Sequence, residues 1–217
     1  MNPRFIIILL IIILGCRSKT PSEIRLFGTT DTTIFLKDSL GLIKLTVPIR
    51  YDTFMQWTQY SDCGSCGTER YRFQVKTAPV FLESGFFWDH LEDSVDQLTI
   101  IHQQRLRKKD STDDNFIKVR HKSFREEVDA ELWSPKNSLV FDTLQIVGGK
   151  WNSLLTTEHY DSSSYLYSKA VAGRMLISGK PIMIIFSLLT KNRDSTNTEF
   201  IEKSKKMMLR IFEQNGI

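Results

Sequence analysis

Ten consecutive apolar residues, 5–14, lie near the start of the chain and limit which part of it can belong to a folded domain. The run follows the cation Arg4 and is closed by Gly15 and Cys16. A helix needs about 20 apolar residues to cross the hydrocarbon core of a bilayer, so this run is too short to span it. One positive charge, a short apolar core and a small residue are typical of a secretory signal peptide. We therefore expect residues 1–15 to be removed and to take no part in the fold.

The end of this run, with the sequence ILGC at positions 13–16, resembles the lipobox of bacterial lipoproteins. In that family a signal peptidase cuts before the cysteine, which carries diacylglycerol. The resemblance implies that Cys16 is lipidated and becomes the first residue of the mature protein. It also implies an acyl-anchored protein of the cell envelope on the non-cytoplasmic side of a membrane. Arg17 stands where an inner-membrane retention signal would place Asp, which favours an outer membrane if the cell has one.

The remainder of the chain has the size of one domain. Removing fifteen of 217 residues leaves 202, enough to bury about 70% of the unfolded surface. Its 28 basic and 25 acidic residues are nearly balanced, whereas a nucleic-acid-binding protein concentrates basic charge. We therefore expect no nucleic-acid partner. Residues 16–30 are polar and contain Pro21 and Gly28, which predicts a tether, and residues 31–217 are predicted to form a single domain.

Short segments of strand character, separated by turn residues, predict an antiparallel sheet. Residues 38–41 and the pairs at 148–149 and 172–173 are among the expected turns. Residues 97–102 read as a strand or as the end of a helix that begins at residue 91. The predicted strands are 32–37, 42–47, 54–60, 69–75, 80–82, 139–147, 151–158, 165–172, 175–178 and 182–189, together with 97–102.

Two helices are expected beside this sheet. The first begins near Asn115, ends at Ser134-Pro135, and is predicted to bury the stripe Phe116, Val119, Phe124, Val128 and Leu132. The second begins near Asn197 with a capping box formed by Thr196 and Glu199, ends before Gly216, and is predicted to bury Phe200, Ser204, Met207, Met208, Ile211 and Phe212.

Strands grouped into meanders with a middle and a C-terminal helix predict an α+β domain, with an antiparallel β-sheet packed by both helices. The order of two early strands, a middle helix, a late meander and a final helix resembles the α/β/α Mog1/PsbP-like fold. Members of that fold are mostly accessory and binding proteins, and several small bacterial lipoproteins use it.

Cys63 and Cys66 form a CGSC motif between two predicted strands, at the tip of an expected hairpin. A compartment that permits disulfides favours a bridge between them. A redox pair would need an acidified thiolate, usually at a helix N-terminus, and an alternating strand follows here instead. The C-x-x-C-G pattern also resembles one half of a zinc ribbon, but zinc needs four ligands and no second cysteine pair exists. Free thiols are the remaining alternative.

No motif for nucleophilic hydrolysis, phosphate binding or metal-dependent hydrolysis occurs in the sequence. The four histidines are isolated and are predicted to be surface or packed residues rather than catalytic bases. We therefore expect a non-catalytic binding or accessory protein without cofactor or metal, whose partners are the membrane and an envelope protein or glycan. The alternative is a thiol- or metal-dependent envelope enzyme centred on the CGSC motif.

Overall fold

The structure is a computed structural model that describes residues 28–60, 67–78, 83–84, 87–88, 94–104, 115–129, 138–161, 165–191 and 198–216. The expected signal peptide, most of the tether, and the strand predicted at 80–82 lie outside these ranges. The same is true of Cys16, Cys63 and Cys66.

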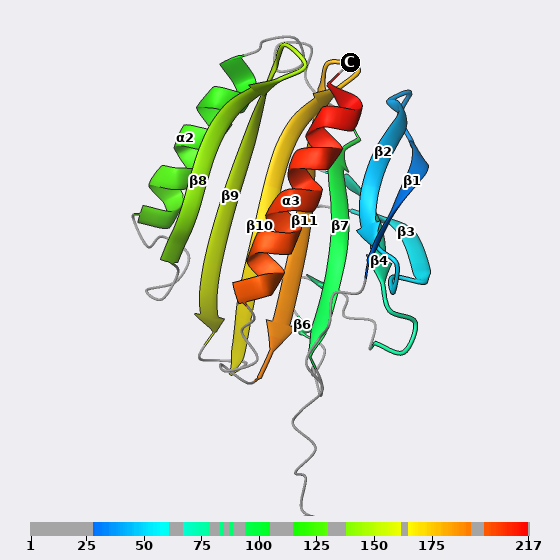
Figure 1. The fold of residues 1–217 in the computed structure, drawn as a ribbon. Helices are drawn as coiled ribbons and strands as arrows, with labels where there is room; N and C mark the ends of the chain where they lie inside the picture. Colours follow the sequence, from blue (N-terminus) through cyan, green and yellow to red (C-terminus); the bar gives the residue numbers. More distant parts are fainter. Residues whose placement is uncertain are drawn as a thin grey trace, which may run out of the picture.

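One antiparallel sheet dominates the described residues, with the strand order β3-β4-β7-β11-β10-β9-β8 (Figure 1). A separate hairpin is formed by β1 and β2, and β5 pairs with β6. The strands are β1 (Thr29–Leu36), β2 (Gly41–Pro48), β3 (Thr53–Gln59), β4 (Thr68–Gln74), β5 (Glu83–Ser84), β6 (Phe87–Trp88), β7 (Val95–Gln103), β8 (Ser138–Val147), β9 (Lys150–Asp161), β10 (Leu166–Ile177) and β11 (Lys180–Thr190), and the helices are α2 (Asn115–Asp129) and α3 (Thr198–Asn215).

The two helices cover opposite faces of the sheet. Successive side chains of a strand point to opposite faces. In β10, a Cβ on Gly173 would lie 2.4 Å from Sδ of Met208 in α3. The guanidinium of the next residue, Arg174, lies 5.0 Å from the ring centroid of Phe124 in α2. The sheet is therefore the middle of three layers, with α3 running along β10 and β11 in Figure 1.

The main core lies between the sheet, α3 and the β1–β2 hairpin. Helix α3 presents apolar residues at helical spacing, and these fill the space above β10 and β11. Its buried side chains are Phe200, Ile201, Ser204, Met207, Met208, Ile211 and Phe212. The hairpin adds Leu36, Ile43, Leu45 and Val47 to the same core.

Hydrogen bonds from a single side chain fasten β2 to the end of α3. The amide of Asn215 accepts a hydrogen bond from Lys44 N at 2.9 Å and donates one to Lys44 O at 2.8 Å. It therefore pairs with β2 as a neighbouring strand would. This contact sets the position of the hairpin relative to the helix.

The predicted α+β class is confirmed. Both early hairpins, the late meander and the C-terminal helix lie close to their expected positions, and residues 97–102 belong to strand β7. The turns at Gly148-Gly149 and at Ser178-Gly179 have positive φ at both central residues, as tight hairpin turns require. The predicted boundary between tether and domain, at residues 30 and 31, falls inside β1, so the folded part begins earlier than expected.

The prediction of two strands at 165–172 and 175–178 was wrong, because β10 continues through Gly173. A glycine usually marks a turn, but here it makes room for α3. The three nearest atoms to an added Cβ all belong to Met208 and Phe212, at 2.4–2.9 Å. The close packing of α3 against β10, rather than a turn, explains why glycine occupies position 173.

The predicted buried stripe of the middle helix was also wrong at one position. Val119 is 60% exposed, whereas Ile117 and His121 are buried. At about 100° per residue, Val119 lies on the opposite side of the helix from Ile117. The predicted end of this helix and Leu132 lie outside the described residues, and Val128 is on a turn whose side chains are not described.

Candidate functional site

The sequence-predicted site residues Cys16, Cys63 and Cys66 lie outside the described residues, so their state stays a prediction. Strands β3 and β4, on either side of the CGSC motif, pair as predicted, with Gln59 opposite Thr68 at the last pair. Within the described part of the chain, no group of three or more His, Cys, Asp or Glu side chains could hold a metal ion.

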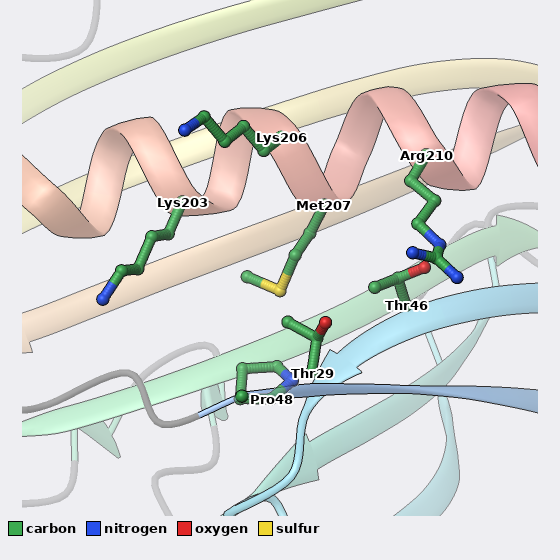
Figure 2. Close-up of a pocket in the computed structure, with 8 residues that line it drawn as sticks. Thr29, Thr46, Pro48, Lys203, Lys206, Met207 and Arg210 are labelled. Carbon is green, nitrogen blue, oxygen red and sulfur yellow. The ribbon is translucent and has the colours of Figure 1, made fainter.

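A pocket of about 400 Å³ lies between α3 and the β1–β2 hairpin (Figure 2). Met207 of α3 points toward Thr29 and Pro48 of the hairpin (Figure 2), and the buried side chains of Met207 and Pro48 form the apolar base of the pocket. The residues that line the pocket are Gly28, Thr29, Thr46, Pro48, Lys203, Lys206, Met207 and Arg210. Gly28 and Thr29 belong to the predicted tether, residues 16–30, so the pocket lies at the expected junction of tether and domain.

Three cations of α3 surround this apolar surface. Lys203, Lys206 and Arg210 lie three and four residues apart, which places them on neighbouring positions of the helix. In Figure 2, Arg210 reaches toward Thr46, whereas the Lys206 side chain extends away from Met207 at the margin of the pocket. The pocket therefore combines an apolar base with positive charge.

Two of these cations have exposed acidic partners. Arg210 pairs with Asp31 of β1, and Lys203 pairs with Glu199 one turn earlier in α3. A hydrogen bond from Thr46 at 2.8 Å is the main reason that the pKa of Asp31 lies below its ordinary value. Exposed ion pairs contribute little free energy, so an anionic ligand could compete for either cation at small cost.

A second cluster of polar groups is buried beside the turn of the β1–β2 hairpin, and it centres on Glu69 of β4. The Glu69 side chain is only 2% exposed. It accepts hydrogen bonds from Lys37 at 2.8 Å, Thr58 at 2.5 Å and Gln104 at 2.7 Å. Burial raises its pKa, but these three bonds outweigh burial and hold the pKa below the ordinary value. Both oxygens of the Glu69 carboxylate accept hydrogen bonds. The carboxylate therefore links residues at the ends of neighbouring strands and is poorly placed to act as a base.

A chain of hydrogen bonds continues from this cluster through Tyr71 to His102. Lys37 N donates to the Tyr71 hydroxyl at 2.8 Å, and that hydroxyl lies 3.1 Å from Nε2 of His102. Nδ1 of His102 lies 3.2 Å from the Gln103 carbonyl, which assigns the ring proton to Nδ1 and makes Nε2 the acceptor. Burial lowers the pKa of His102, so the ring is neutral and its 3.7 Å approach to Asp38 is not an ion pair at neutral pH.

We expect this buried histidine to make stability fall as pH falls from about 7.5 to 5.5. The unfolded chain protonates His102 near pH 6.5, whereas the folded chain resists protonation, and each pH unit then costs at most about 1.4 kcal/mol. Asp38 and Glu69 oppose the effect and Lys180 adds to it. Guanidinium unfolding at several pH values should show this slope, and His102→Gln should flatten it. A slope equal in wild type and His102→Gln would contradict the assignment.

Neither group of residues was predicted from the sequence. Glu69 lies in phase with Tyr71 and Phe73 on the core face of β4, and an acidic residue in such a position is a detectable signal. The pocket has a weaker signal, the cations Lys203, Lys206 and Arg210 beside the buried Met207. Its other wall comes from the hairpin, more than 150 positions earlier in the chain.

Comparisons with known proteins add no assigned activity. No protein-family model and no curated protein sequence matches the chain. A crystal structure of PA94, a protein of unknown function from Pseudomonas aeruginosa, is similar to 82% of this chain and 94% of its own, with 11% identity and a TM-score of 0.29. In the described segments, no helix is both long and apolar enough to cross a membrane.

Proposed function

We propose that this protein is a lipid-anchored cell-envelope protein that binds a ligand in the pocket between α3 and the β1–β2 hairpin, without catalysing a reaction. The pocket is the observation that carries the proposal. It combines an apolar surface at Met207 and Pro48 with the cations Lys203, Lys206 and Arg210. Pockets of a few hundred Å³ with an apolar lining and a few charged groups are the usual form of small-molecule sites.

The position of the pocket supports the link between binding and anchoring. Twelve residue steps separate Cys16 from Gly28, and an extended chain spans at most about 3.6 Å per step, or about 40 Å in all. A bilayer that holds acyl chains on Cys16 would therefore lie within about 40 Å of the pocket. We also propose the Mog1/PsbP-like fold for this domain, because the order of layers α2, sheet and α3 agrees with the α/β/α layering that this resemblance implies.

Mass spectrometry of the full chain, extracted from bacterial membranes in a mild neutral detergent, tests this function. We expect an N-terminal peptide that begins at acylated Cys16, and a non-covalent adduct on the intact protein. Thr29→Trp should fill the pocket and remove the adduct, because Thr29 lines the pocket and is exposed enough to tolerate the change. Thr33→Trp, at another exposed position of β1, should retain it.

The two parts of the function can fail separately. An N-terminus that carries no lipid would contradict the anchor. An adduct of equal occupancy in Thr29→Trp and Thr33→Trp would contradict the pocket as the binding site.

A further inference from the structure

We propose that the ligand of this pocket is an anionic phospholipid of the membrane that holds the anchor, with the phosphate of its headgroup bound by the α3 cations. The inference rests on the proposed function, because it names the ligand of the same pocket. It commits to lipid rather than to a soluble anion, a glycan or a protein.

The charge around the pocket complements that of a phosphate group. Lys203, Lys206 and Arg210 face two carboxylates, Glu199 and Asp31, so the immediate surroundings retain a positive charge. A neutral glycan would supply no counter-charge to these cations. A phosphate diester supplies one, and Lys and Arg are the side chains that bind phosphate in proteins.

The exposed ion pairs make the exchange of partners feasible. The side chains of Arg210 and Asp31 are 55% and 45% exposed, and those of Lys203 and Glu199 are 36% and 53% exposed. Both pairs are therefore about half exposed to solvent, where an ion pair contributes little free energy, so a phosphate can replace a carboxylate at small cost. The Thr46 hydroxyl, which donates to Asp31, also lines the pocket.

The apolar part of the pocket distinguishes a lipid from a free anion. Met207 and Pro48 are buried at the base of the pocket, and the small apolar surface that they leave open offers no hydrogen bond to inorganic phosphate but can contact the glycerol and the first methylenes of an acyl chain. A volume of about 400 Å³ lies within the range of small-ligand sites, so it suits a headgroup rather than whole acyl chains. The remaining chain would stay in the bilayer, which the predicted anchor keeps close.

The test is a titration of the full chain, purified in neutral maltoside micelles, with short-chain dihexanoylphosphatidylglycerol. We expect saturable binding that is several-fold tighter than binding of zwitterionic dihexanoylphosphatidylcholine, and tighter than binding of inorganic phosphate. A cation near an anionic lipid surface contributes about 1 kcal/mol, which is about fivefold in affinity. Lys203→Ala should therefore weaken binding about fivefold, and Lys203→Glu about 25-fold.

Helix α2 offers a matched control on the other face of the sheet. Lys122 pairs with Glu126 four residues away, as Lys203 pairs with Glu199. Lys122→Glu makes the same change of charge and breaks the same kind of ion pair, and it should leave lipid affinity unchanged. A melting curve for each variant shows whether it folds.

Three outcomes would overturn the inference: equal affinity for the two short-chain lipids, equal affinity for inorganic phosphate, or equal loss of affinity in Lys203→Glu and Lys122→Glu. The N-terminal peptide of the same preparation separates this failure from failure of the anchor. Acylated Cys16 with no preference for anionic lipid contradicts the ligand alone, whereas unacylated Cys16 contradicts the anchor whatever the titration shows.

Discussion

Phe212→Ala is expected to lower the free energy of unfolding by about 3–5 kcal/mol, because the ring is fully buried between α3 and the sheet. The substitution removes apolar contact and leaves a cavity that the surrounding side chains fill only in part. Gly173 lies against the same ring, so the lost apolar contact is at the centre of the interface between α3 and β10. Guanidinium unfolding of the full chain in neutral detergent measures the change.

Phe35→Ala provides the control for the same chemical change. Phe35 lies in β1 and is 65% exposed, and we expect its removal to cost less than about 1 kcal/mol. Similar losses in the two variants would show that α3 does not pack on the sheet through Phe212.

Gly173→Val is expected to destabilise the protein by about 1–3 kcal/mol, although valine is the better strand former. An added Cβ would lie 2.4 Å from Sδ of Met208 and 2.8 Å from Cζ of Phe212, so the helix or its side chains must shift. The sign of the change is diagnostic. At a strand position with free space, replacing glycine would stabilise the fold, because glycine loses more backbone entropy on folding.

Two further variants make this prediction specific. Ala172→Val changes the neighbouring residue, which is half-buried on the opposite face, and should have a smaller effect. In a double-mutant cycle, Met208→Ala should make Gly173→Ala less destabilising than it is in the wild-type background, because the closest obstructing atoms are gone. Strict additivity of the two substitutions would contradict direct contact between these positions.

Both predictions concern the same structural requirement of the proposed site. The pocket exists only while α3 lies at a set distance from the β1–β2 hairpin. Gly173 and Phe212 determine how closely the helix approaches the sheet, and Asn215 fastens its end to Lys44 of β2. We therefore expect substitutions at these positions to weaken ligand binding through displacement of Lys203 and Arg210, without contact with the ligand.

The elements that could be predicted from the sequence are those whose signals are local. Helix α3 repeats apolar residues at helical spacing over five turns, and its buried residues were predicted almost completely. The hairpin turns depend on residues such as Gly148 and Gly149, which adopt positive φ at no steric cost. These patterns are sufficient to specify an antiparallel α+β fold.

The sequence gives little indication of a residue's role when that role depends on contact with a segment far away in the chain. Gly173 has the local signature of a turn, but its role comes from Met208 and Phe212 in a helix that follows much later. Arg72 of β4, for which no prediction was made, alternates with the apolar residues Tyr71 and Phe73 but is itself fully buried, with Nε donating to Thr99 at 3.2 Å and its guanidinium 4.9 Å from the centroid of Trp57. Neither the partner nor the burial is visible within a short window of sequence.

Local patterns in the sequence were enough to predict the fold class, the strand positions of both early hairpins, and the buried face of α3, because backbone geometry and apolar spacing act over a few residues. In contrast, the pocket shared by Thr46 and Arg210, and the hydrogen-bonded cluster that contains Glu69 and His102, depend on tertiary contacts between elements. Those groups come from segments far apart in the chain. They meet because burial of the common core brings α3 and the β1–β2 hairpin onto the same face of the sheet.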